Sequence, residues 1–230
     1  MLPFRHVGGH NPGQWLGLID AVYGISMTLM IFNLPKTLKE IAIQYTTHPE
    51  YFGNEAFVFT INIIDYIVIF LVLYEVWCFH KTILLASSNP PHRVHGHITA
   101  LILVVISVTP AYAIFLINAQ GHELLSLTAP SLSYLKMRST AFFVFLSAAI
   151  SYGLLTLLAR INGAQGDRAV LKLCRQSAQA RCLLFAAFFL TSLMAYRYAY
   201  TWIRPNILAL GYIVVSFHQD HILRWIRRPQ

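Results

Sequence analysis

The first apolar stretch of the chain runs from Trp15 to Leu34 and places the strongest constraint on its fold. Its roughly 20 residues are enough to cross a bilayer core of about 30 Å as one α-helix, because a helix rises about 1.5 Å per residue. The stretch carries a single charge, Asp20, close to its start. It therefore predicts a membrane-spanning helix.

The composition extends this interpretation to the rest of the chain. Of the 230 residues, 57% are hydrophobic and 11% are charged, whereas soluble domains are roughly a quarter charged. The most polar stretch, 162–181, separates four apolar segments from two that follow it. We predict an all-α integral membrane protein with one membrane domain over 1–230 and six transmembrane helices: 15–34, 56–79, 97–118, 139–161, 182–203 and 205–222. The loops are expected at 35–55, 81–96, 119–137 and 162–181.

Basic residues are distributed unevenly between the two sides of these spans. With both termini inside, the inner segments hold most of the 17 Lys and Arg residues. The positive-inside rule therefore predicts a multi-pass cell-membrane protein with cytoplasmic N- and C-termini. The basic clusters at 172–181 and 224–228 are expected to contact anionic lipid headgroups. Nucleic acid is not an expected partner, because no basic-aromatic module lies outside the membrane.

One face of the first span carries three bulky apolar residues and one hydroxyl: Ile25, Thr28, Leu29 and Phe32. At about 100° per residue these side chains fall within about 60° of Ile25, whereas Asp20 falls about 140° away. Such a stripe can line a pathway. It is also typical of ordinary helix packing, with Thr28 hydrogen-bonded to the carbonyl of Gly24.

The acid of the first span needs a polar partner, because an unpaired charge in a low-dielectric region is costly. Trp77 and His80 lie near the cytoplasmic end of the second span, at a depth similar to that of Asp20. An indole N–H and an imidazole can both hydrogen-bond a carboxylate across two helices. We therefore predict a helix-packing polar network of Asp20, Trp77 and His80. The alternative is that Trp77 and His80 only anchor the helix end at the interface.

These positions resemble the transmembrane protein 175 family. DAVYGISMTL, which begins at Asp20, is similar to the first-span signature of that family, in which an arginine and Phe-Ser-Asp precede a small-apolar run ending in Thr-Leu. WCFH, which ends at His80, resembles its Trp-x-x-His, and Pro110 stands at its mid-span proline. The resemblance covers about the first half of the chain. Three positions replace the arginine, Phe and Ser of the signature: Gln14, Leu18 and Ile19.

The resemblance implies a potassium channel with six spans per subunit and four subunits around one axis. It assigns Ile25 to the narrowest hydrophobic ring, Thr28 to a hydroxyl layer one turn outward, and Leu29 and Phe32 to further constrictions. An apolar neck gates by dewetting, and a ring of hydroxyls can replace part of a hydration shell. We expect passive conduction with a leaky potassium preference and no cofactor besides the permeant ion.

Two other functional classes remain as alternatives. The first is a proton-coupled membrane transporter, because four ionisable residues lie in or near the bilayer: Asp20, Asp65, Glu75 and His80. The second is a non-conducting membrane scaffold. A transporter would saturate and depend on a pH gradient, whereas a channel conducts under voltage alone.

Catalysis and metal binding have little support in the sequence. Three histidines lie close together in the second inner loop: His92, His95 and His97. Their H-x-x-H-x-H spacing lacks a fourth ligand, so we expect a solvated, pH-sensitive loop and no metal. The sequence has no HExxH, no GxSxG and no paired-glutamate motif, so we expect no catalytic residues and no enzyme.

Overall fold

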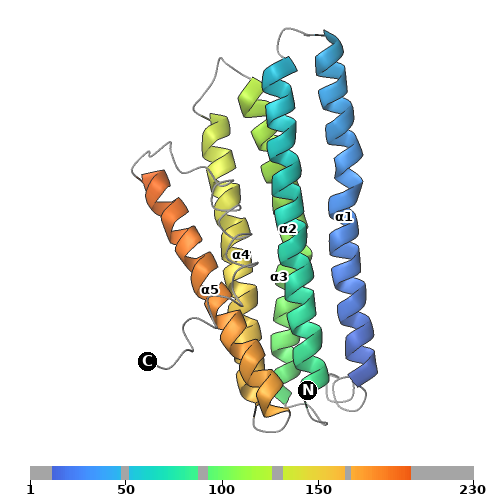
Figure 1. Cartoon of the computed structure of the whole chain (residues 1–230), viewed down its shortest axis with the longest axis vertical. Helices are drawn as coiled ribbons and strands as arrows, with labels where there is room; N and C mark the ends of the chain where they lie inside the picture. Colours follow the sequence, from blue (N-terminus) through green and yellow to red (C-terminus); the bar gives the residue numbers. More distant parts are fainter. Residues whose placement is uncertain (1–11, 48–51, 88–92, 126–131, 164–166, 198–230) are drawn as a thin grey trace, which may run out of the picture.

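The structure, a computed structural model, describes residues 12–47, 52–87, 93–125, 132–163 and 167–197. These ranges contain five α-helices and no strand: α1 (Pro12–Thr47), α2 (Phe52–Ala86), α3 (Arg93–Leu125), α4 (Leu132–Asn162) and α5 (Arg168–Arg197). Successive helices run in opposite directions along one bundle, with α1 and α5 at its two edges (Figure 1). The all-α prediction is confirmed for the part of the chain that the structure describes.

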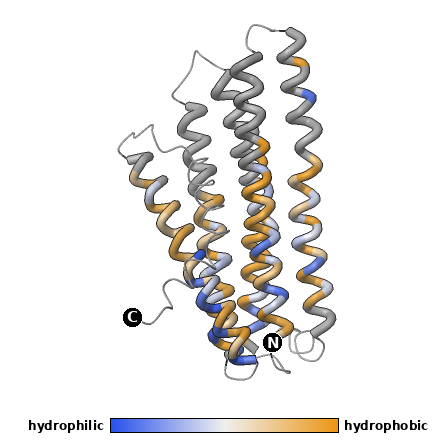
Figure 2. The backbone as a smooth tube through the Cα atoms, in the orientation of Figure 1, coloured by the Kyte–Doolittle hydropathy of each residue, from blue (hydrophilic) through white to orange (hydrophobic). Residues whose placement is uncertain are grey.

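Three of the described helices are long and apolar enough to cross a membrane. Their apolar stretches are Tyr66–Ala86 in α2, Val94–Tyr112 in α3 and Phe143–Asn162 in α4. Hydrophobic residues (orange) predominate along the described parts of α2 and α4 (Figure 2). α1 contributes a shorter apolar stretch, Leu16–Phe32. The predicted sixth span, 205–222, lies outside the described residues, so the count of six stays a prediction.

The helices extend well beyond the apolar segments, which corrects two predicted loops. α1 continues past Pro35 to Thr47, through much of the loop expected at 35–55. α5 begins at Arg168, within the stretch 162–181 that the sequence predicts to be a polar connection. The 36 residues of α1 measure about 54 Å, longer than a bilayer core of about 30 Å. Apolar composition marks only the part of a helix that faces lipid or the protein core. It therefore underestimates the length of a helix that continues beyond that part.

A few defined hydrogen bonds lie at the end of the bundle where α1 and α5 begin. α1 begins at Pro12, a residue that suits a first helical turn because that turn needs no N–H from it. Oδ1 of Asp167 caps α5 by accepting from the backbone N–H of Ala169 (3.0 Å) and of Val170 (3.3 Å). The backbone N–H of Asp167 also donates to the carbonyl of Ala86 at 2.9 Å, which ties the start of α5 to the end of α2.

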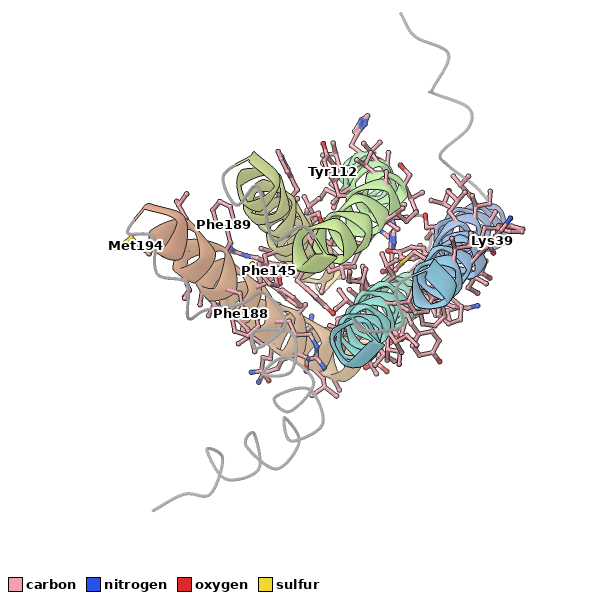
Figure 3. All side chains as sticks on the ribbon, turned by 90° about the horizontal axis from the view of Figure 1, so that it is seen from above. Lys39, Tyr112, Phe145, Phe188, Phe189 and Met194 are labelled. Carbon is pink, nitrogen blue, oxygen red and sulfur yellow. The ribbon has the colours of Figure 1, made fainter. Side chains whose placement is uncertain are left out.

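Aromatic side chains fill the contact between α4 and α5. Phe145 and Phe188 lie close together in the view along the bundle (Figure 3), with ring centroids 5.8 Å apart. Tyr152 and Phe185 stack with their centroids 5.7 Å apart. α4 also packs against α3, whereas α1 packs against α2 and α3 at the edge of the bundle. Within the described ranges, this position leaves one side of α1 without a neighbouring helix.

Candidate functional site

α1 divides its residues between a buried face and an exposed face. Four of its residues are at most 2% exposed: Ile19, Tyr23, Ser26 and Met30. Their spacing of three or four residues places them on one side of the helix, which packs against α2 and α3. The core contact of α1 is therefore fully occupied by residues outside the predicted pore stripe.

The predicted pore stripe lies on the side of α1 that faces away from the bundle. Ile25 is 62% exposed, Leu29 46% and Phe32 73%, and Thr28 is exposed as well. The stripe lies about 140° around the helix from the buried face. Among the described residues, it therefore contributes little to the packing of α1 against the other helices.

Thr28 carries its hydroxyl on this exposed side. Its Oγ1 donates a hydrogen bond of 2.7 Å to the carbonyl oxygen of Gly24. Because the hydroxyl proton is used within the helix, the oxygen keeps its lone pairs available as an acceptor. An exposed acceptor oxygen on an otherwise apolar helix face is chemically suited to a cation or to its hydration water.

Small residues continue along the exposed side of α1. Gly17, Ala21 and Gly24 are all exposed, and with Thr28 they recur every three or four residues. A Cβ atom added at Gly17 or at Gly24 would meet nothing within 4 Å. Small residues at this spacing allow a second helix to approach closely in a membrane. This row was not among the predicted site residues, although its spacing is visible in the sequence.

Asp20 has two partners on α2. Nε1 of Trp77 donates a 2.7 Å hydrogen bond to Oδ1 of Asp20. Nζ of Lys81 lies 3.3 Å from Oδ1 and 3.1 Å from Oδ2, and also 4.8 Å from the centroid of the Trp77 ring. Lys81 was not among the residues predicted to contact Asp20. Its position four residues after Trp77 was the available signal, because residues at this spacing share a helix face.

His80 lies away from this carboxylate, which corrects the expectation that it partners Asp20. The ring is fully buried, with Nδ1 3.4 Å from Oη of Tyr23 and Nε2 3.3 Å from Oγ1 of Thr99. His80 belongs to the inward row of α2 that includes Val76 and Ile83, which are also fully buried. It therefore joins α1, α2 and α3 inside the bundle, while Trp77 and Lys81 meet Asp20 at its edge.

The predicted histidine loop is also corrected by the structure. His95 is buried on α3, where its Nδ1 lies 3.0 Å from Nδ2 of Asn162 on α4. His97 is exposed, and His92 lies outside the described residues. Within the described ranges, no group of three or more His, Cys, Asp or Glu side chains is placed to hold a metal ion.

Glu75 joins α2 to α4 and α5. Its Oε2 accepts a 2.6 Å hydrogen bond from Oη of Tyr152, and its Oε1 pairs with Arg181. The guanidinium carbon of Arg181 also lies 5.0 Å from the centroid of the Phe79 ring. Glu75 and Asp20, two of the four ionisable residues of the transporter hypothesis, are thus held in ion pairs, and the side chain of Asp65 lies outside the described residues.

The proline of α3 leaves one backbone carbonyl without its helical hydrogen-bond donor, and a side chain of α1 donates to that carbonyl instead. Pro110 lies inside α3 and has no N–H to donate to the carbonyl of Ile106, four residues earlier. Oγ of Ser26, on the buried face of α1, lies 3.5 Å from that carbonyl oxygen and donates to it. The mid-span proline and the serine of the first span thus form one contact between two helices.

Comparison with known proteins finds one family model that is similar to part of the chain. A family model described as "Endosomal/lysosomal potassium channel TMEM175" matches residues 16–110. This range runs from the start of the apolar stretch in α1 through α2 to Pro110 in α3, and it contains the exposed stripe, Asp20, Trp77 and His80. The match confirms the predicted family resemblance over that part of the chain. Neither the curated proteins nor the solved structures gave a significant match.

Proposed function

We propose that this chain, in which residues 16–110 match a potassium channel family, is a subunit of a passive, potassium-preferring cation channel. The exposed face of α1 lines the pore in this proposal. The supporting observation is that the stripe from Ile25 to Phe32 is exposed, while the opposite face of the same helix is buried in the subunit. A single exposed stripe cannot enclose a pathway, so copies of α1 from several subunits have to surround it.

The chemistry of the exposed side favours an axis between subunits over contact with lipid alone. A helix face that contacts only lipid tails needs bulky apolar side chains, and it needs neither a hydroxyl nor a glycine. The side that carries Ile25 and Phe32 also carries Thr28, Gly17 and Gly24. The glycines allow helices to approach, and the threonine oxygen offers an acceptor to an ion or to water.

Ion passage follows from the order of the residues along α1. Four copies of Ile25 form an apolar neck, which a cation does not cross without its hydration water, so the neck gates by dewetting. Oγ1 of Thr28 lies almost one turn further out and replaces part of the hydration shell. Leu29 and Phe32 narrow the outer part of the pathway. Potassium releases its water more readily than sodium, so this arrangement gives a modest preference for potassium.

A homotetramer in the cell membrane, with both termini in the cytoplasm, is the assembly that we propose. The transporter alternative has less support, because proton relays need carboxylates that can exchange protons. Asp20 is paired with Lys81, and Glu75 is paired with Arg181 and hydrogen-bonded by Tyr152. These contacts suit roles in helix packing.

A flux measurement on purified protein in liposomes tests the proposed pore. Ile25→Asn should wet the neck and increase potassium flux or remove its selectivity. Ile31→Asn is the matched control, because Ile31 is 51% exposed on the same helix but lies about 120° from Ile25. Flux should follow voltage without a pH gradient. Equal flux in wild type and both variants would contradict the assignment of the neck, and dependence on a pH gradient would favour the transporter.

A further inference from the structure

A cavity lies between α4 and α5 at the inner end of the bundle. It measures about 160 Å³, enough for a group larger than one water molecule. Four cationic side chains line it: Arg160, Arg168, Lys172 and Arg175. Figure 2 shows hydrophilic residues (blue) gathered at these ends of α4 and α5.

The cations reach the cavity from both helices. Arg168, Lys172 and Arg175 are spaced four and three residues apart, so they share one face of α5. Arg160 lies in the last turn of α4 and lines the cavity from the other side. Ala159 and Leu171, each 1% exposed, contribute apolar walls. The packing of α4 against α5 therefore holds four positive charges around one concave surface.

Little negative charge from the described residues opposes these cations. Within the described ranges, the ion pairs are Lys81 with Asp20 and Arg181 with Glu75, and neither pair includes a cation of the cavity. Asp167, next to Arg168, directs Oδ1 to the backbone N–H groups of its own helix. The like charges repel one another, so an anion bound among them would be stabilised by all four.

The chemistry of these side chains selects a phosphate group. Guanidinium groups match the oxygens of phosphate with paired hydrogen bonds, and a lysine ammonium adds a point charge. A phosphate monoester carries up to two charges at neutral pH and offers three acceptor oxygens. A phosphate monoester is therefore expected to bind among four cations more strongly than a carboxylate, which carries a single charge.

The position of the cavity favours a lipid as the source of that phosphate. The apolar stretch of α4 ends at Asn162, and α5 begins at Arg168, so the cavity lies where the hydrocarbon region gives way to headgroups. The cavity lies on the side of the membrane that the distribution of basic residues assigns to the cytoplasm. We propose that this cavity binds the phosphate headgroup of an anionic membrane lipid, a binding role that is independent of ion conduction.

Native mass spectrometry of the full-length protein can count bound lipid directly. Protein in neutral detergent is titrated with phosphatidic acid, with phosphatidylcholine, or with inorganic phosphate as the soluble source of the same group. We expect one high-affinity phosphatidic acid per chain and weaker binding of the other two. Arg168→Gln with Lys172→Gln should weaken that site about 25-fold, at about five-fold per cation removed.

Two lysine variants control for folding and for unspecific charge attraction. Lys172→Arg keeps the charge and should retain binding. Lys39→Gln removes the same charge from an exposed position on α1, at the edge of the bundle opposite α5 (Figure 3), and should leave lipid affinity unchanged. Equal affinity in wild type and the double variant would overturn the proposed site, as would an equal loss in Lys39→Gln. Binding of inorganic phosphate without binding of phosphatidic acid would overturn the lipid assignment.

Discussion

Nε1 of Trp77 donates a 2.7 Å hydrogen bond to Oδ1 of Asp20, and this contact joins the second helix to the N-terminal half of the first. Lys81 completes the contact by pairing with the same carboxylate and lying over the indole ring. The proposed pore helix is thus fixed to its own subunit on one side by a charged contact, while its opposite side stays exposed.

Trp77→Phe should destabilise the subunit by about 1–2 kcal/mol, because it removes the indole N–H but keeps an aromatic ring under Lys81. The free energy of unfolding in detergent, measured by a denaturant titration, checks this value. In a double-mutant cycle, Asp20→Asn should lose much of its effect when Trp77 is already Phe. Simple additivity of the two effects would contradict a direct interaction.

Ser26→Ala should cost about 1 kcal/mol, because it leaves the carbonyl of Ile106 without a donor. Pro110→Ala supplies a backbone N–H for the same carbonyl, so Ser26→Ala should cost less in that background. Thermal unfolding of the four proteins measures this coupling. The same cost of Ser26→Ala with and without Pro110 would show that the serine does not compensate for the proline.

Gly24→Leu should weaken association between subunits while leaving the fold of each subunit intact. A Cβ at this position meets nothing within 4 Å in the subunit, so the new side chain would occupy only the proposed approach of a second helix. Size-exclusion chromatography with light scattering gives the oligomeric state. Gly24→Ala is the matched control and should still form the tetramer, and an unchanged tetramer in Gly24→Leu would contradict close contact at this face.

Thr28→Val should reduce the preference for potassium over sodium about two- to five-fold, a shift of about 0.4–1 kcal/mol that is expected of a weak hydroxyl ligand. The substitution keeps the shape of the side chain but removes the acceptor oxygen. Reversal potentials under asymmetric potassium and sodium provide the measurement. Thr28→Ser keeps the oxygen and should retain the preference, so equal selectivity in all three proteins would exclude the hydroxyl as the determinant.

Cys174 should react slowly with maleimide at neutral pH. It lies near the start of α5, before the predicted span at 182–203. Burial raises the pKa of its thiol above the ordinary value. The reactive thiolate therefore accumulates only at higher pH than it does for an exposed cysteine. Labelling rates from pH 7 to 10 in a Cys78→Ala, Cys182→Ala background check this, with an added Gln179→Cys at an exposed position of α5 as the reference.

The sequence was sufficient to predict the helical class and the family resemblance over residues 16–110. Helix class follows from the length of the apolar segments alone, because about 20 such residues match a bilayer core. The family signature around Asp20 and Trp77 is likewise local, and the family match over 16–110 confirms it. The angle between the Ile25 stripe and Asp20 is also fixed by the sequence, because it follows from the 3.6-residue period of the helix.

Only the tertiary structure decided which residues of α2 contact Asp20. Trp77, His80 and Lys81 lie within five residues on α2, and the sequence alone does not say which of them reaches Asp20. The rotation of α2 against α1 turns His80 inward to Tyr23 and Thr99, and turns Lys81 toward the carboxylate. The cavity among Arg160, Arg168 and Lys172 likewise exists only because α4 and α5 pack together. Spacing along a chain fixes the faces of one helix, whereas contacts between helices depend on how those faces are rotated against each other.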